Sequence, residues 1–185
     1  YFKLDVSEVL EWTKLKSTWG KSKLRLLLRK GRLKNIYKHW QSLTCHRCFT
    51  MLISNEILVA DSDTHTLRIV KESLLQNGFV VHFAHSCELA MQLAIKNKPD
   101  LILSEINLVD MDGREFMRMV QKTPEISHLP FIFLTSRTLI SDKIATLEAG
   151  ADDYITKPFN ENELIARIKA VLRRFNRSSI STLTK

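Results

Sequence analysis

Short apolar runs alternate with longer amphipathic segments from residue 56 to residue 175. Most of the runs are too continuously apolar for a strand with one face in water. Strands of a parallel sheet are covered by helices on both faces, and continuous apolar runs are typical of them. The pattern therefore predicts five parallel strands, at residues 57–60, 79–84, 101–104, 131–135 and 153–156.

The segments between these strands have the periodicity of amphipathic helices. Their apolar residues recur three or four positions apart, which places them on one face of a helix. Gly78, Gly113 and Gly150 fall where such helices should begin or stop. Strands joined by right-handed helical crossovers form an open, doubly wound α/β sheet, which is the predicted fold. The predicted core-facing stripes are Leu67, Val70 and Leu74; Ala90, Leu93 and Ala94; Ile140, Ile144 and Leu147; and Leu164, Ile165, Ile168, Val171, Leu172 and Phe175.

Positive charge is concentrated at the start of the chain. Residues 1–50 hold 12 Lys/Arg and 3 Asp/Glu, whereas residues 51–185 hold 16 and 17. All three tryptophans also fall in the first fifty residues. This shift in composition predicts a boundary near Met51. The predicted organisation is a basic extension over residues 1–50, an α/β domain over residues 51–175 and a polar tail, linker or disordered, over residues 176–185.

The basic extension has two interpretations. Its stretch KSKLRLLLRKGRLKNIYKHW is partly amphipathic and carries interspersed aromatic residues. Such a stretch is typical of an arm that binds nucleic acid or an anionic membrane surface. The alternative is an extension that is disordered or foreign to the native protein. The alternative is favoured because the chain starts at Tyr1, while Met51 lies just before the first predicted strand.

Cysteine usage and hydropathy narrow the class of protein. Three cysteines, a small and odd number, favour a reducing compartment and hence a cytoplasmic location. No apolar run approaches the ~20 residues that span a bilayer, and the N-terminal region lacks the apolar stretch of a signal peptide. Cys45 and Cys48 have C-x-x-C spacing, but neither a convincing second ligand pair nor a thioredoxin-like context accompanies them.

Polar residues follow four of the five predicted strands. Asp61 follows the first, Glu105 the third, Thr135 closes the fourth and Lys157 comes just after the fifth. In an open α/β sheet the carboxyl ends of the strands share one edge, where ligands bind. Each residue alone has a structural explanation as a cap, a strand end or a surface charge. Together, two carboxylates, a hydroxyl and an ammonium could hold a divalent cation and a phosphoryl group.

Residues 55–175 resemble the receiver domain of bacterial two-component response regulators over its full length. The segments that carry the resemblance are ILVADSD, KPDLILSEINLVDMDG, LPFIFLTS and AGADDYITKPFNENELIARIKAVLRR, the last being similar to the OmpR/PhoB subfamily. The resemblance implies a flavodoxin-like fold with helices on both faces of the sheet. It also implies a signalling role rather than an enzymatic one, with a histidine kinase or a downstream signalling protein as partner. DNA would be a partner only through an output domain that this chain lacks.

The resemblance also assigns roles to the strand-end residues. It places the phosphoacceptor at Glu105, where receivers have an aspartate, and the phosphoryl-contacting hydroxyl at Thr135. Lys157 matches the lysine that pairs with the acceptor, and Pro158 after it implies a cis peptide bond. Tyr154 matches an aromatic residue whose ring turns inward or outward with the state of the site.

The implied metal site is weakened in this sequence. The resemblance implies Mg²⁺ ligation by Asp61, Glu105 and the backbone carbonyl of Asn107, whereas Ser62 replaces the usual second acidic ligand. Loss of that carboxylate weakens Mg²⁺ binding. Since Glu105 is also longer than aspartate by one methylene, it is poorly placed as a nucleophile and well placed to imitate a phosphoryl group. The sequence thus favours a pseudo-receiver, and a receiver still phosphorylated within a truncated transcriptional regulator is the alternative.

Two further interpretations remain. The resemblance implies a weak symmetric homodimer through the fourth helix, fifth strand and fifth helix of the domain, and exposed ion pairs contribute only ~0–1 kcal/mol each to such a contact. The residues of this predicted dimer face are Lys143, Asp153, Glu163, Arg167 and Arg174. A flavodoxin-like enzyme that binds a nucleotide or flavin is disfavoured, because an acidic stretch rather than a glycine-rich phosphate loop follows the first strand.

Overall fold

The computed structural model describes residues 54–181, with side chains described for residues 54–175. Five parallel strands form one sheet in the order β2–β1–β3–β4–β5. The strands are β1 (Glu56–Ala60), β2 (Val80–Ala84), β3 (Leu101–Ser104), β4 (Phe131–Thr135) and β5 (Asp153–Thr156). All five predicted strands are confirmed, with bounds that differ by at most one residue. The predicted basic extension, its binding roles and its C-x-x-C pair lie outside the described residues.

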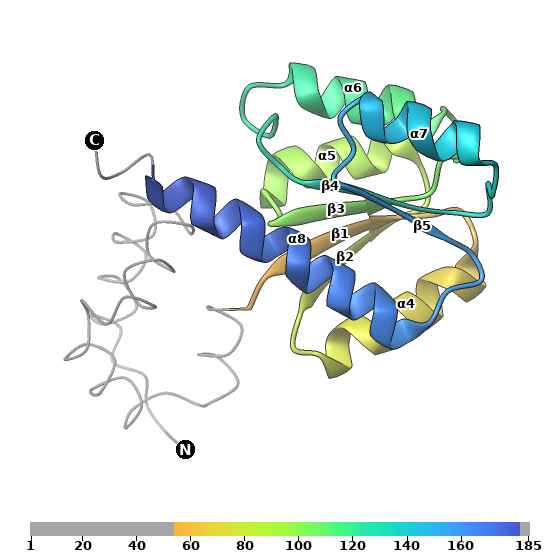
Figure 1. Cartoon of the computed structure of the whole chain (residues 1–185), viewed down its shortest axis with the longest axis horizontal. Helices are drawn as coiled ribbons and strands as arrows, with labels where there is room; N and C mark the ends of the chain where they lie inside the picture. Colours follow the sequence, from red (N-terminus) through yellow and green to blue (C-terminus); the bar gives the residue numbers. More distant parts are fainter. Residues whose placement is uncertain (1–53, 182–185) are drawn as a thin grey trace. The chain divides into compact units, whose positions relative to one another are not determined.

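Helices cover both faces of the sheet (Figure 1). Two of them, α4 (Thr64–Gln76) and α8 (Glu161–Ser181), lie on one face. The other three, α5 (Cys87–Asn97), α6 (Gly113–Lys122) and α7 (Ile140–Glu148), lie on the opposite face. This is the doubly wound α/β architecture that the alternating pattern predicts. No helix within residues 54–181 has both the length and the apolar character needed to cross a bilayer.

Successive strand residues point to opposite faces of the sheet and so build two cores. Leu58 and Phe133 pack on the side of α5 and α6, whereas Ile57 and Ile132 pack on the side of α4 and α8. The stripe predicted for α8 lies in the second core, as expected. Every residue of β3 and β4 is buried, so these strands hold the side chains at the carboxyl edge of the sheet in fixed positions.

Helix α7 departs from the predicted packing. The spacing of Ile140, Ile144 and Leu147 predicts a core-facing stripe, but these side chains are 75%, 51% and 37% exposed. Thr146 is the buried residue of this helix. Periodicity identifies an apolar face of a helix without specifying what that face meets. Here α7 contacts the domain through a small side chain and turns its apolar stripe outward, so this prediction is wrong.

Helix α8 is longer than the sequence predicts. The predicted polar tail begins at residue 176, whereas the helical backbone continues to Ser181. Neither glycine nor proline follows Phe175, so the sequence contains no strong signal that would end the helix there. The helical backbone therefore extends through residues 176–181 of the segment predicted as a linker or disordered tail.

Candidate functional site

The carboxyl edge of the sheet brings together polar side chains from four strand ends. The Lys157 Nζ lies 2.6 Å from Asp61 Oδ2 and 2.8 Å from Glu105 Oε2. Backbone hydrogen bonds extend the strand pairing into the site, because the N–H of Lys157 donates to Thr135 and that of Glu105 to Ala60. The parallel topology thus holds residues up to 96 positions apart within direct contact.

Glu105 is buried, and both of its carboxylate oxygens accept hydrogen bonds. Oε1 accepts from the backbone N–H of Ile106 at 2.7 Å and of Asn107 at 3.4 Å. Oε2 accepts from the backbone N–H of Ser136 at 3.3 Å and contacts the Lys157 ammonium. The carboxylate therefore fills a cluster of donors, of the kind that binds anions.

The three charges of the site are coupled through Lys157. Burial acts to raise the pKa of Glu105, but hydrogen bonds from Lys157 and Thr135 outweigh it and hold the pKa below its ordinary value of 4.5. Burial prevails at Asp61 and raises the pKa of that carboxyl despite Lys157. Burial also acts to lower the pKa of Lys157, but hydrogen bonds to both carboxylates raise it overall. Glu105 and Lys157 are thus both charged at neutral pH.

Close backbone packing fixes the loop after β3. A Cβ at Gly113 would lie 2.3 Å from the carbonyl oxygen of Glu105, so no larger residue fits. The N–H of Gly113 also donates to the carbonyl of Ile106 at 2.7 Å. Further along the loop, the Asp110 carboxylate accepts from the first two N–H groups of α5, beginning with Cys87. The loop that carries Glu105 is therefore tied to two helices.

Tyr154 lies inward, with its side chain almost completely buried. Its hydroxyl donates to the backbone carbonyl of Arg137 at 2.9 Å. The N–H of Arg137 in turn donates to the Thr135 hydroxyl at 3.2 Å. Burial raises the pKa of the Tyr154 phenol, which keeps it protonated as a donor. The end of β4, the loop after it and β5 are thus linked beside Glu105. The Lys157–Pro158 peptide bond is cis, as the resemblance implies.

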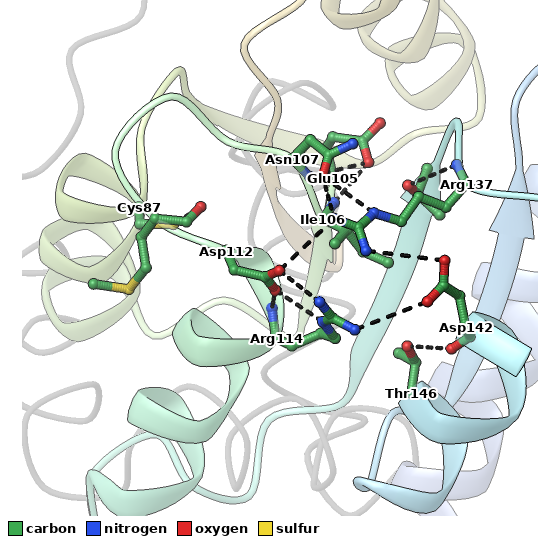
Figure 2. A network of polar contacts seen from close by, with 11 residues as sticks. Cys87, Glu105, Ile106, Asn107, Asp112, Arg114, Arg137, Asp142 and Thr146 are labelled. Atoms are coloured by element: carbon green, nitrogen blue, oxygen red, sulfur yellow. Dashed lines mark hydrogen bonds and ion pairs between the residues drawn. The ribbon is translucent and has the colours of Figure 1, made fainter.

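Arg137 is a residue of the site that the sequence pattern does not predict. Its guanidinium donates twice to the side-chain oxygen of Asn107, from Nε at 3.1 Å and from Nη2 at 2.8 Å (Figure 2). Asn107 thereby contributes a side chain as well as the backbone carbonyl that the sequence predicts. The available signal was a basic residue two positions after Thr135, in the loop that leaves the sheet edge.

The donor set does not fit a resident Mg²⁺ ion well. One Asp61 oxygen pairs with Lys157 and the other accepts from the backbone of Asp63. Asp63, the next carboxylate along, caps α4 by accepting from two N–H groups of that helix. Ser62 offers only an exposed hydroxyl. Within residues 54–181, no three His, Cys, Asp or Glu side chains gather as metal ligands, and Mg²⁺ sites rely on carboxylate oxygens in near-octahedral geometry.

The residues predicted for a dimer face lie on α7, β5 and α8. Three of them pair within the chain: Arg167 contacts Asp153 Oδ2 at 3.1 Å and Glu163 Oε1 at 2.8 Å. Lys143 is exposed on α7, and Arg174 is exposed on α8. The charges of this face are therefore largely satisfied within one protomer.

Known proteins resemble this chain over the same α/β region. The sequence profile of the response regulator receiver domain matches residues 57–169. The response regulator MprA of Mycobacterium ulcerans is 38% identical over 122 residues, which are 66% of this chain and 52% of MprA. MprA of Mycobacterium sp. strain KMS is 39% identical over 118 residues, 64% of this chain and 50% of that protein. The chain spans about half the length of these curated relatives.

Solved structures match in fold as well as in sequence. A two-component response regulator from Clostridium difficile superposes with a TM-score of 0.62 at 32% identity, covering 66% of this chain and 99% of that structure. The BeF3-activated receiver domain of DrrB gives a TM-score of 0.57 at 33% identity, covering 65% and 98%. From the profile match, the relatives and the fold together, this chain belongs to the response regulator receiver domain family of two-component signalling systems.

Proposed function

We propose that this chain is a pseudo-receiver, in which the Glu105 carboxylate imitates the phosphoryl group that other receivers carry on an aspartate. The observation that carries the proposal is the position of that carboxylate. It accepts hydrogen bonds from three backbone N–H groups and contacts the Lys157 ammonium at 2.8 Å. A phosphoryl group on a shorter aspartate would need these same donors. Glutamate, longer by one methylene, brings its own negative charge to them.

Phosphotransfer to Glu105 is absent or much reduced under this proposal. A phosphodonor must approach in line with the attacking oxygen, and a displacement of about 1 Å can slow such a reaction ~10²-fold. Both oxygens of Glu105 already accept hydrogen bonds. Lys157 pairs with the Asp61 carboxylate, which would otherwise be free to hold Mg²⁺. The extra methylene of Glu105 and the replacement of the usual second acidic residue by Ser62 both reduce phosphotransfer as well.

The inward position of Tyr154 supports an activated state. Within the family resemblance, this aromatic ring turns inward or outward with the state of the site. Here the ring is buried and its hydroxyl donates to Arg137 in the loop after β4. That loop also donates from Ser136 to Glu105. The Glu105 carboxylate therefore stabilises the same loop that holds Tyr154 inward.

Output by protein–protein contact follows from this state. The face formed by α7, β5 and α8 fits a second copy of the chain in a weak symmetric homodimer. Leu139, Ile140 and Ile144 are exposed there, and burial of apolar surface contributes roughly 25 cal/mol per Å². Ion pairs add little, because Arg167 is already paired within the protomer. A histidine kinase or a downstream signalling protein is the expected partner, in the cytoplasm.

Incubation with acetyl phosphate and Mg²⁺, followed by intact-protein mass spectrometry, tests the proposal. The wild-type chain should gain no phosphoryl group. The double variant Ser62→Asp with Glu105→Asp restores both family residues and should gain one. Glu105→Gln is the control, because it keeps the length of the side chain and lacks the nucleophile. A phosphoryl adduct mapped to Glu105 of the wild-type chain would refute the pseudo-receiver.

The rival function is a receiver phosphorylated at Glu105 within a longer transcriptional regulator. The curated relatives are about twice the length of the matched region, which leaves room in them for an output domain. An adduct on wild-type Glu105 in the same experiment would favour this rival. DNA binding would then belong to the output domain rather than to the α/β domain described above.

A further inference from the structure

Helix α7 is weakly anchored to the domain by apolar contacts. Thr146 is its buried residue, and the helix begins after Leu139 without a side-chain hydrogen bond at its N-cap. By comparison, α6 buries Phe116, Met117 and Val120. Since apolar burial is the main force that holds a helix on a sheet, polar contacts must contribute an unusual share to the position of α7.

Those polar contacts converge on Asp142, in the first turn of α7. The Arg114 Nη1 lies 4.0 Å from one oxygen of Asp142, and the Arg137 Nη1 lies 3.9 Å from the other (Figure 2). Within α7 the Asp142 backbone carbonyl accepts from the Thr146 hydroxyl at 2.7 Å. The side chains of all three charged residues are about one quarter to one third exposed, so water screens the pairs only in part.

Each arginine is held firmly at its other end. Arg114 makes two hydrogen bonds to the Asp112 carboxylate, at 3.0 and 2.8 Å. Arg137 makes two hydrogen bonds to Asn107, and its Nη2 lies 3.9 Å from Asp112. Two-point contacts of this kind fix the plane of a guanidinium as well as its position. Arg114 in α6 and Arg137 in the loop after β4 are therefore both anchored on the loop that follows β3, and both face α7.

Arg137 also joins this network to the site. Its carbonyl accepts from Tyr154, its N–H donates to Thr135, and the residue before it donates to Glu105. A change at Glu105 that shifts this loop must also shift the guanidinium that faces Asp142. The contacts of this one residue thus run from the carboxylate of the site to the first turn of α7.

We propose that Arg114 and Arg137 act as positioning residues, forming with Asp112 and Asp142 a charged clasp that sets the position of α7 relative to the site. The clasp consists of these four residues. It goes beyond the pseudo-receiver function, since it operates whether or not Glu105 accepts a phosphoryl group. Because α7 carries exposed apolar side chains, the clasp controls how that surface is presented.

Hydrogen–deuterium exchange of the full chain tests the clasp. Asp142→Asn should speed exchange of the α7 amides, residues 140–148, about two- to fivefold, which is the range expected for partly exposed ion pairs. Exchange in α4 and α8, on the opposite face of the sheet, should stay unchanged and so report an intact fold. Glu148→Gln is the matched control: this exposed residue of α7 has no ion pair among the described residues, and its substitution should leave exchange in α7 unchanged.

A mutant cycle separates the clasp from the helix dipole, which also favours a carboxylate in the first turn of α7. In a chain with both Arg114→Met and Arg137→Met, Asp142→Asn should cause little further acceleration, because its partners are gone. An equal effect of Asp142→Asn in both backgrounds would overturn the proposal, as would no effect in the wild-type background.

The unsubstituted chain gives an independent measurement. Added NaCl should speed exchange in α7 selectively, and a salt-independent rate would count against the clasp.

Discussion

The Lys157 ammonium lies 2.8 Å from the Glu105 carboxylate, although β3 and β5 are not neighbours in the sheet. Since β4 lies between them in the sheet, this contact depends on the length of the lysine side chain. The same ammonium contacts Asp61, so one half-buried cation pairs with two buried carboxylates. Removing one partner of a buried charged cluster leaves the others without compensation, which makes these residues sensitive to substitution.

Lys157→Met should destabilise the domain strongly at neutral pH. It keeps most of the apolar stem but leaves two buried carboxylates without a counter-charge, which costs about 3–5 kcal/mol. Urea unfolding at neutral and at mildly acidic pH measures the effect. The loss should shrink as pH falls, because both carboxyls can then take up protons and become neutral.

Lys143→Met is the control for that experiment, because Lys143 is exposed on α7. Its substitution should change the free energy of unfolding by no more than about 0.5 kcal/mol. Similar losses in the two variants would show that Lys157 does not compensate buried charge.

The pH dependence of stability should reveal the lowered pKa of Glu105. A carboxyl whose pKa is lower in the folded state contributes stability that is fully present above its unfolded value, here about 4.5, and that is lost as pH falls through the folded value. Glu105→Gln removes this contribution. The wild-type chain should therefore exceed Glu105→Gln in unfolding free energy at neutral pH, and the difference should narrow below pH 4.5. A difference in unfolding free energy that stays constant across this pH range would contradict the prediction that Glu105 is ionised with a lowered pKa.

The strand-end residues could be placed from the sequence because of the parallel topology. A parallel order puts all carboxyl ends on one edge, so Asp61, Glu105 and Lys157 had to converge once the strands were identified. Apolar runs identify such strands well, since both faces are buried. The close contact of Lys157 with both carboxylates follows from this arrangement and from the length of its side chain.

Other features depend on tertiary contacts that periodicity does not encode. The apolar spacing of Ile140 and Ile144 correctly indicates one face of α7, but the helix is held by Asp142 and packs through Thr146 instead. Arg137 could not be assigned to the site from the sequence, because a long side chain can adopt many rotamers that point in different directions. Its direction is decided by the position of Asn107 across the site. Sequence patterns thus gave the framework of the site more readily than its network of side-chain contacts.

Mg²⁺ should have little effect on the stability of the wild-type chain. A ligand that binds only the folded state stabilises it by an amount that grows with the ratio of the free ligand concentration to Kd. In the wild-type chain Lys157 competes with Mg²⁺ for the Asp61 carboxylate, which keeps this ratio low. Thermal unfolding with millimolar Mg²⁺ or with EDTA should give nearly the same midpoint. The double variant Ser62→Asp with Glu105→Asp adds an acidic ligand and shortens the acceptor, so Mg²⁺ should raise its midpoint. A clear rise in the wild-type chain would show that its site holds the ion despite Ser62.

Gly113→Ala should disturb the site more than an ordinary glycine substitution. The new Cβ would lie 2.3 Å from the carbonyl oxygen of Glu105, and that neighbour is backbone, which cannot turn aside. We expect a loss of about 3 kcal/mol, at the upper end of the range for overpacking. Gly78→Ala is the matched control: it has a positive φ of 78° but nothing within 4 Å of the new Cβ, so it should lose only about 1 kcal/mol.

The same substitution tests whether the β3 loop places Glu105. If Gly113→Ala displaces the Glu105 carboxylate from Lys157, then Glu105→Gln should cost less in the Gly113→Ala background than in the wild-type chain. Urea unfolding of the two single variants and the double variant provides the comparison. In the Gly78→Ala background, Glu105→Gln should keep its full effect, because Gly78 lies beyond the far end of α4. Additive losses for Gly113→Ala and Glu105→Gln would mean that the loop backbone and the carboxylate are energetically independent, and that the donors hold Glu105 in place without help from this close contact.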